Sequence, residues 1–520
     1  MRASRASWPC RALLAAGSIA LSRLTRRTKP PVVIALALLS WLGNAVMAAS
    51  EPELAPRPKR LVLLLDGTEN GPEQDVDSSY GYKLYKPTNV LKTYRAIRAV
   101  DEGVDQVAYY SEGVGSEIGQ PTPFSGLGVF VDRFLGGLFA FGYEPRVKDA
   151  YRFLVANYKP GDQIFVFGFS RGAAEAQTLV RFIAWIGGVL PDKDLGGILK
   201  KQDEYYIPEL YDGFRGSQIK PYSHSNQGKA QEVFDRIRAR RCTSERSGGP
   251  VELAQCRQRA IGDPVGAQID VLGVYETVVS VGSRLAPDGS VTTVAERYAY
   301  LVDRIPPKIV KTIRQALSVD EARWDFRPQV WQPDDDSLAK SGALMQRWFP
   351  GVHSNVGGGF RYDELANHAL GWLLDKTNLR AELGLDPDYM IHFLRSSECA
   401  DASRPNSDTA VYKFAELIRF KSGRGIRKLA TWDKAGSWER SGLGFHESLG
   451  RLLIDDCTYR PQNLLEFLAQ HPQRIAEFPA SQQGDIRQIV ELSRGGKRSP
   501  KPYYLCRPPV DCTAAAPAAH

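Results

Sequence analysis

Short apolar runs, separated by amphipathic stretches, dominate the middle of this chain. The clearest runs occupy residues 61–65, 163–167 and 269–274. Because few polar residues interrupt them, these runs are typical of strands that a parallel sheet buries on both faces. Between them the pattern predicts one more strand and three helices, at residues 104–110, 89–99, 145–158 and 173–185 respectively. This alternation predicts an α/β fold with a mostly parallel sheet flanked by helices.

The same pattern divides the chain into segments. We interpret the polar residues 190–267 as an insertion that forms a lid beside the site. Residues 381–510 are predicted to form a helical C-terminal extension, with helices at 387–395, 410–420 and 462–468. The other segments are a leading segment (1–49), a Pro-rich linker (50–58), a main α/β domain (59–380) and a tail expected to be disordered (511–520).

The leading segment has the three parts of a secretory signal. A basic stretch ends at residues 26–29, an apolar run follows at 32–41, and small residues stand at 46–49. This order predicts a signal peptide and therefore export to the periplasm or the exterior. Two alternatives stay open. The segment is an uncleaved inner-membrane anchor, because residues 32–49 almost reach the length that spans a bilayer, or translation begins at Met47.

Charge gives no reason to expect a polyanionic partner. The 520 residues carry a net charge of +8, but the first 49 hold seven basic side chains and no acidic one. The rest of the chain balances 60 basic against 59 acidic residues. We therefore expect no nucleic-acid partner.

Six cysteines remain when Cys10, in the leading segment, is set aside. An even number suits disulfides in an oxidising compartment. The predicted pairs are Cys242 with Cys256, Cys506 with Cys512, and Cys399 with Cys457. The alternative is six unpaired thiols, because a domain of this size does not need covalent staples. No CxxC spacing occurs, so zinc is not expected.

Residues 168–172, Gly-Phe-Ser-Arg-Gly, are the only Gly-x-Ser-x-Gly pentapeptide of the chain. It lies between a predicted strand and a predicted helix, which is the place of a nucleophile elbow, a sharp turn that holds the serine hydroxyl clear of the sheet. Ser170 is therefore the predicted nucleophile of an α/β-hydrolase-like fold. The alternative is a tight turn with an incidental serine.

A serine nucleophile needs a base, and the chain has seven histidines to choose from. His353 precedes the glycines at 357–359, which suggests a loop passing close to another segment. In this fold the acid lies between serine and histidine in the chain, and Glu276, just after a predicted strand, is the best-placed candidate. The predicted triad is Ser170, Glu276 and His353. The alternatives are a locally satisfied loop histidine and a surface charge at a strand end.

Backbone amides are predicted to stabilise the oxyanion. In this fold they come from the residue after the nucleophile, here Arg171, and from the turn after an early strand, here Gly67 and Thr68. Asp66 in that turn either contacts the substrate or caps the turn. Phe124 and the aromatic residues that follow it either line an acyl pocket or pack in the interior.

These motifs together resemble the DUF2235 family, which includes phospholipase effectors of type VI secretion systems. The matching blocks occur in order at residues 65–70, 110–115, 168–173, 273–278, 318–328 and 349–353. The resemblance implies an α/β-hydrolase fold with Ser170, Glu276 and His353 at the serine, acid and histidine positions, and cleavage of acyl esters in glycerophospholipids. The family usually has aspartate at the acid position and at the position of Asn355, and its effectors generally lack a signal segment.

The sequence thus predicts an exported serine hydrolase, phospholipase A-like, that works through an acyl-enzyme. No metal or cofactor is expected, and the substrate is a lipid or small ester, met at a membrane surface in the case of a lipid. The resemblance implies a secretion-system or immunity partner. Two alternatives stay open: a soluble carboxylesterase, and a non-catalytic binding protein on a hydrolase scaffold.

Overall fold

One sheet runs through the described part of the chain. The computed structural model describes residues 57–67, 87–113, 138–191, 203–217, 227–244, 263–278, 304–323, 326–360, 363–396, 427–433, 436–456 and 458–494. Within these residues the sheet has eight strands: β1 (Arg60–Leu65), β2 (Val100–Asp101), β3 (Val104–Ser111), β4 (Gln163–Phe169), β5 (Ile269–Tyr275), β6 (Val310–Ser318), β7 (Leu344–Phe349) and β8 (Leu443–Phe445). Their order is β2-β3-β1-β4-β5-β6-β7-β8, and all neighbours are parallel except β2 and β3. The predicted α/β fold with a mostly parallel sheet is confirmed.

Strand β1 shows how the sequence buries both faces of this sheet. The side chains of its apolar run have no exposed surface. Successive side chains of a strand point to opposite faces. Leu61, Leu63 and Leu65 accordingly join one apolar cluster, whereas Val62 and Leu64 join a second cluster on the other face.

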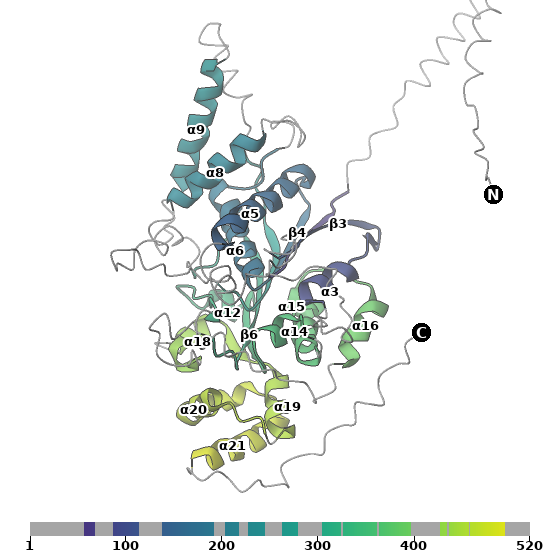
Figure 1. Cartoon of the computed structure of the whole chain (residues 1–520), viewed down its shortest axis with the longest axis vertical. Coiled ribbons are helices and arrows are strands. Elements are labelled where there is room, and N and C mark those ends of the chain that lie inside the picture. Colours follow the sequence, from purple (N-terminus) through teal and green to yellow (C-terminus); the bar gives the residue numbers. More distant parts are fainter. Residues whose placement is uncertain are drawn as a thin grey trace, which may run out of the picture. The chain divides into compact units, whose positions relative to one another are not determined.

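Helices cover both faces. The first cluster includes four helices: α5 (Leu138–Asn157), α6 (Arg171–Ile186), α8 (Asp203–Ser217) and α9 (Gln227–Ser244). The other face carries α3 (Asn89–Ala96), α14 (Glu364–Leu374), α15 (Lys376–Leu379) and α16 (Pro387–Ser396). Figure 1 shows α5 and α6 on one side of the strands and α3, α14 and α16 on the other. Two short helices, α12 (Ser337–Lys340) and α13 (His353–Gly357), flank β7 in the chain.

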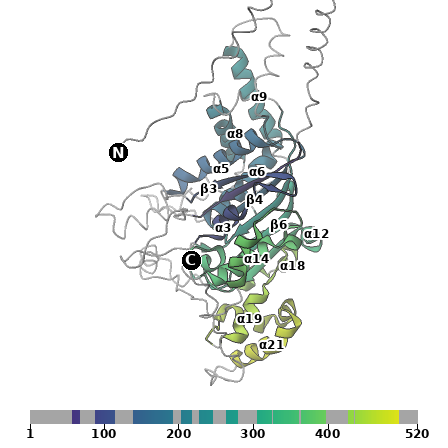
Figure 2. The same ribbon diagram turned by 90° about the vertical axis from the view of Figure 1, so that its right-hand side faces the viewer.

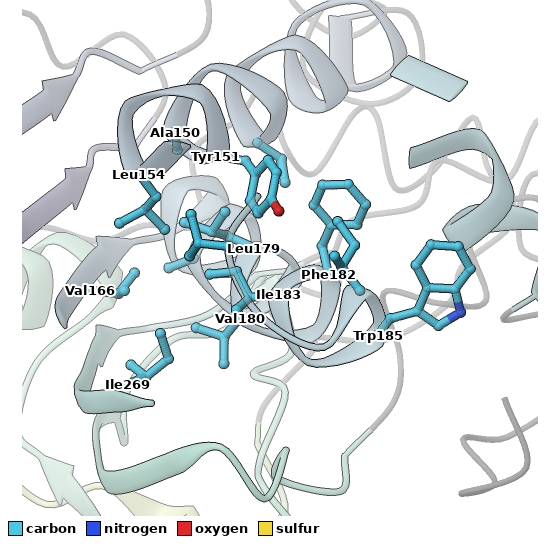
Figure 3. Close-up of a cluster of buried hydrophobic side chains, with 14 of the residues drawn as sticks. Ala150, Tyr151, Leu154, Val166, Leu179, Val180, Phe182, Ile183, Trp185 and Ile269 are labelled. Atoms are coloured by element: carbon cyan, nitrogen blue, oxygen red, sulfur yellow. The ribbon is translucent and has the colours of Figure 1, made fainter. Parts of the chain in front are cut away.

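Helix α6 is buried along its whole length. Figure 3 shows the side chains around it, which come from α5, β4, β5 and α6 itself. Each large apolar side chain buried in this way contributes about 1.5–3 kcal/mol, so α6 is held firmly on the sheet. Helix α8, from the predicted insertion, packs on the carboxyl-terminal half of α6: Phe182 lies 5.2 Å from Tyr211 and Trp185 lies 5.9 Å from Phe214, between ring centroids. The role of this insertion as a lid stays a prediction.

The segment predicted as a helical extension also supplies strand β8, which pairs with β7. Besides α16, the helices described in this segment are η6 (Leu429–Trp432), α18 (Ser437–Arg440), α19 (Glu447–Asp455), α20 (Gln462–Gln470), η7 (Pro472–Glu477) and α21 (Ala480–Arg494). They pack around a third apolar cluster that includes Leu317 of β6 and Trp348 of β7. Figure 2 shows α19 and α21 together in this group. The extension therefore shares both a sheet and a core with the rest of the fold.

Several sequence predictions can be compared with these bounds. The helices expected at 387–395 and 462–468 are present as α16 and α20. Helix α5 begins at Leu138, so Pro145 lies inside the helix and not at its start as predicted. A proline favours a first helical turn but does not mark one by itself. The leading segment, residues 50–56 of the linker, the helix expected at 410–420 and the tail at 511–520 lie outside the described residues. Among the helices that are described, none combines the length and apolar character needed to cross a membrane.

Candidate active site

Ser170 lies in a sharp turn between β4 and α6. Its backbone angles are φ 58° and ψ −120°, a region that residues other than glycine rarely enter. The neighbouring strand holds this turn: the amide of Ser170 donates to Tyr275 O at 3.0 Å, and Ser170 O accepts from the amide of Val278 at 3.3 Å. A strained serine between a strand and a helix is the geometry of a nucleophile elbow.

Close packing explains both glycines of the pentapeptide. A Cβ on Gly168 would lie 2.5 Å from Gly172 O, and a Cβ on Gly172 would lie 2.1 Å from Leu65 O. Each added carbon would meet main-chain atoms, which cannot rotate away as a flexible side chain can. The first turn of α6 therefore leaves no room for a side chain at position 168, and the end of β1 leaves none at position 172.

His353 begins helix α13, after the turn that follows β7. Its ring lies between two aromatic rings, with centroid distances of 4.8 Å to Phe169 and 4.8 Å to Phe326. Phe169 is the residue before Ser170, so the strand that carries the serine contacts the histidine. Gly357 permits this approach, since a Cβ there would lie 2.0 Å from an atom of the Phe169 ring. The glycines after His353 thus have the close-approach role that their density suggested.

Glu276 follows β5 and lies beside the histidine. Nδ1 of His353 is 3.2 Å from Oε2 of Glu276, and both side chains are buried. Because an ionised carboxylate can only accept, Nδ1 carries the proton in this bond and Nε2 keeps a free lone pair. Ser170, Glu276 and His353 follow the carboxyl ends of β4, β5 and β7, in the chain order of α/β hydrolases.

Arg427, which the sequence analysis did not single out, binds both carboxylate oxygens of Glu276. Its Nη1 and Nη2 donate to Oε1 and Oε2 of Glu276 at 2.8 and 2.7 Å, and the amide of Ser318 donates to Oε1 at 2.6 Å. Burial alone raises the pKa of Glu276, but the charge of Arg427 and the hydrogen bonds from His353 and Arg427 bring this pKa below its ordinary value. No sequence signal could have found Arg427, because it lies 151 residues from Glu276 and outside any motif.

Two further charged groups face His353. The amide of His353 donates to Oε2 of Glu321 at 3.2 Å, and Glu321 is paired with Arg323 at 2.8 Å. Burial lowers the pKa of His353 below its ordinary value, while the bond to Glu276 works in the opposite direction. The imidazole is therefore neutral at neutral pH, the form that a general base requires.

The turn after β1 is organised by Asp66. Its Oδ1 accepts from the amide of Gly67 at 2.7 Å, and its Oδ2 accepts from the hydroxyls of Thr88 and Tyr110 at 2.5 and 2.8 Å. Burial raises the pKa of Asp66 to about 6, although these hydrogen bonds oppose the shift. Asp66 thus caps the turn, one of the two roles that its position suggested. The amide of Gly67 is engaged by this carboxylate in the present geometry.

Another buried carboxyl, which the sequence predictions did not name, lies near the start of α6. Glu175 is 1% exposed, and its Oε2 has no hydrogen-bond partner among the residues that the structure describes. Burial raises its pKa to about 8, against the charges of Arg146 and Arg171. Glu175 is therefore mostly protonated at neutral pH, so it adds little negative charge beside the elbow.

The remaining candidate residues stay predictions. Cys242 lies in α9. The others lie outside the described residues: Thr68, Phe124, Cys256, Cys399, Cys457, Cys506 and Cys512. Within the described ranges, no group of three or more His, Cys, Asp or Glu side chains could hold a metal ion.

Comparison with known proteins gives a family and several distant similarities. The family model described as "T6SS, Phospholipase effector Tle1-like, catalytic domain" matches residues 59–376. The uncharacterized protein YEL023C of Saccharomyces cerevisiae is 25% identical over 287 residues, which are 53% of this chain and 33% of the yeast protein. The chain thus spans about a third of the length of that relative.

Two solved structures are more distant. One shows the Tle1 effector bound to the VgrG spike of the type 6 secretion system; it is 16% identical, with 61% of this chain and 56% of that chain covered and a TM-score of 0.24. The other is an uncharacterized protein from Pseudomonas aeruginosa, 15% identical, with 90% of this chain and 66% of that chain covered and a TM-score of 0.34.

Proposed function

The chain belongs to the Tle1-like family of type VI secretion phospholipase effectors, and from this premise we propose that it is a serine hydrolase that cleaves acyl esters of glycerophospholipids. One contact supports the assignment above the others. His353 Nδ1 lies 3.2 Å from Glu276 Oε2, while the backbone of Ser170 is hydrogen-bonded on both sides of Glu276, to Tyr275 and Val278. These contacts support the assignment of Ser170 as nucleophile, His353 as base and Glu276 as acid.

In the proposed reaction, Nε2 of His353 takes the proton from Oγ of Ser170 as that oxygen attacks the ester carbonyl. Glu276 accepts from Nδ1 throughout and stabilises the imidazolium. The amide of Arg171, at the first turn of α6, donates to the oxyanion, and the positive end of the helix adds to this stabilisation. The proton on His353 then passes to the leaving alcohol, and an acyl-Ser170 ester remains.

The second half of the reaction repeats the same proton transfers. Nε2 of His353 takes a proton from water as the water oxygen attacks the acyl-enzyme. Collapse of the second oxyanion releases the fatty acid, and the proton returns to Ser170. The products are one fatty acid and one lysophospholipid, and no residue changes its net charge over the cycle.

Delivery and location are part of the proposal. Family membership supports a secreted protein and a partner in the secretion machinery. The basic, apolar and small-residue parts of residues 1–49 support export through a signal peptide. We propose the periplasm or the exterior as the place of action, with an immunity protein as a further partner.

Product analysis on mixed phospholipid vesicles tests the proposal. We expect free fatty acid and lysophospholipid from the wild type and none above background from Ser170→Ala. Ser493→Ala is the matched control: Ser493 is exposed on α21 and its hydroxyl donates only to Val490 O in the described structure. Glu276→Gln should lower kcat by about 10³-fold or more.

The outcomes separate this proposal from the alternatives. Cleavage of short-chain nitrophenyl esters without any release from vesicles would identify a carboxylesterase. A fluorophosphonate probe that leaves Ser170 unmodified in the folded protein would indicate a binding protein. Equal lipid cleavage by wild type and Ser170→Ala would overturn the assignment of the nucleophile.

A further inference from the structure

Arg427 lies outside the part of the chain that the catalytic-domain model matches, residues 59–376. It is nevertheless 3% exposed and contacts the acid of the site. Besides its two bonds to Glu276, its Nη1 donates to Ser318 O at 2.5 Å and its Nη2 donates to Phe326 O at 2.6 Å. Each terminal nitrogen therefore bridges a carboxylate oxygen and a main-chain carbonyl, which fixes the guanidinium plane.

A contribution to stability alone does not explain the buried ion pair between Arg427 and Glu276 well. A buried ion pair often adds little to the free energy of unfolding, because desolvation offsets the attraction. What a two-pronged arginine does supply is orientation, since its fork matches the two oxygens of a carboxylate. Oε2 of Glu276 is the oxygen that accepts from both Arg427 and His353. The position of this oxygen therefore sets the orientation of the imidazole.

The glutamate at this place makes such a support necessary. Its side chain has one more rotatable bond than aspartate, so its carboxylate has more positions to adopt. The backbone at Glu276 also has a positive φ of 47°, which places the start of the side chain in an uncommon direction. Arg427 on both oxygens and the amide of Ser318 on Oε1 together leave one position for the carboxylate.

Helix α20 in turn holds Arg427. Nδ2 of Asn463 donates to Arg427 O at 3.1 Å and to Val319 O, just after β6, at 2.9 Å. The hydroxyl of Tyr459, three residues before α20, donates to Oδ2 of Asp320 at 2.8 Å.

The same Asp320 oxygen accepts from the amide of Gly351 at 2.6 Å, two residues before His353. One short stretch of the C-terminal segment thus supports the acid, through Asn463 and Arg427, and the loop of the base, through Tyr459 and Asp320.

We propose that Arg427 is a positioning residue of the triad, and that the segment around α20 completes the active site by fixing Glu276 through Arg427. The inference rests on the proposed hydrolase function. It does not make Arg427 a catalytic residue, because the arginine reaches the reaction only through Glu276 and His353.

Arg427 also sets the charge around the base. The charged groups facing His353 are Glu276 and Arg427, and Glu321 with Arg323. The Glu276–His353 pair has a net charge of −1, which Arg427 compensates. Without the arginine charge this −1 is uncompensated, and uptake of a proton by the pair becomes more favourable. The apparent pKa of this pair should therefore rise by about one unit, and the acidic limb of kcat/KM should move to higher pH with it.

The test uses the full chain with Arg427→Lys and Arg427→Gln. The matched controls are Arg314→Lys and Arg314→Gln. Arg314 is also fully buried and also donates to main-chain carbonyls, those of Ile313, Ala343 and Gly342, but within the described structure it forms no hydrogen bond with Glu276. Three experiments are carried out on each variant: thermal unfolding gives the melting temperature, kinetics on an acyl ester give kcat and KM, and NMR gives the titration of His353, assigned with His353→Gln.

We expect both Arg427 variants to lower kcat by about tenfold or more with KM little changed, because misplacement of the acid affects the transition state. Arg427→Gln should also raise the apparent pKa of the pair by about one unit, whereas Arg427→Lys, which keeps the charge, should shift it less. The Arg314 variants should have a lower melting temperature than the wild type, but their kcat should stay within about twofold of the wild-type value and their His353 titration should be unchanged.

Two results would overturn the proposal. One is that Arg427 and Arg314 variants have the same kcat and the same His353 titration. The other is that the Arg427 variants fail to fold while the Arg314 variants fold, which would make Arg427 a residue of the fold and not of the site. The NMR titration needs no turnover. If the wild type cleaves no ester, the proposed function fails, while the titration still decides whether Arg427 controls the Glu276–His353 pair.

Discussion

The buried carboxyl of Glu175 should make the stability of this protein fall as the pH rises. The native protein holds the Glu175 proton up to about pH 8, whereas the carboxyl has an ordinary pKa of 4.5. Between these two values the native state binds a proton that the unfolded chain has lost, so the free energy of unfolding decreases with pH. Glu175→Gln keeps the shape of the protonated acid and cannot ionise, so it removes this dependence.

The magnitude follows from the size of the shift. One pKa unit corresponds to ~1.4 kcal/mol, so the rise from 4.5 to about 8 corresponds to ~5 kcal/mol once the carboxyl is ionised in both states. Because Glu175 is 1% exposed, solvent screening reduces this figure little. The difference between Glu175→Gln and the wild type should therefore be small near pH 5 and grow by ~1.4 kcal/mol for each pH unit up to about pH 8.

Urea unfolding of both proteins at several pH values, followed by tryptophan fluorescence, measures this difference. Glu491→Gln is the control for the loss of one carboxylate, because Glu491 is exposed on α21. Its difference from the wild type should be small at every pH. Parallel pH profiles for Glu175→Gln and the wild type would refute the reasoning, since they would show that Glu175 has the same proton affinity in both states.

Two further substitutions test the packing around the site, both read out as urea midpoints. Gly172→Ala should lower the free energy of unfolding by more than ~2 kcal/mol, because its Cβ would lie 2.1 Å from Leu65 O. Gly484→Ala is the control and should raise the free energy of unfolding by ~0.5–1 kcal/mol, because its Cβ would meet no described atom within 4 Å. Equal effects of the two substitutions would contradict the packing argument. Lys92→Met should cost ~3–5 kcal/mol, because the buried Nζ lies 2.7 Å from Asp363 Oδ2. Adding Asp363→Asn should restore part of this loss, and no restoration would argue against an uncompensated buried charge.

Each residue of the predicted triad stands beside a backbone signal in the sequence. The glycines around Ser170 mark a turn in which the Cβ of any larger residue would meet main-chain atoms. Glu276 comes directly after a strand whose apolar run is plain in the sequence. The glycines after His353 mark a loop that packs against the ring of Phe169. Local pattern was sufficient where backbone geometry restricts the residue type.

Strand β6 and Arg427 could not be found in this way. Strand β6 contains Arg314 and Gln315, which are polar but fully buried. Their hydrogen bonds go to distant carbonyls, Arg314 Nη2 to Gly342 O at 2.9 Å and Gln315 Nε2 to Gln329 O at 2.7 Å. A periodicity argument scores such residues as exposed, because the partners that permit their burial appear only in the folded chain. Arg427 could not be predicted for the same reason, because its partners are distant in the sequence.

The backbone strain of the described chain points to the same place as its side chains. Four residues other than glycine have positive φ within the described ranges: Glu102, Ser170, Glu276 and Arg380. Glu102 lies in a turn and Arg380 lies at the end of α15. Both residues are exposed, and positive φ angles are common at such positions. Ser170 and Glu276 instead end two neighbouring strands. Strain of this kind costs about 1–3 kcal/mol for each residue and persists only where the surroundings over-determine it.

For Ser170 and Glu276, residues of the neighbouring strands and of the turn after β5 hold the backbone in place. The amide of Ser170 donates to Tyr275 O, Ser170 O accepts from Val278, and the amide of Glu276 donates to Ala316 O at 2.9 Å. A sheet without a function at this edge could end both strands in relaxed turns. Two strained residues, each held by backbone hydrogen bonds to a neighbouring segment, are explained if the hydroxyl of one and the carboxylate of the other must meet one imidazole, which is what a serine hydrolase requires.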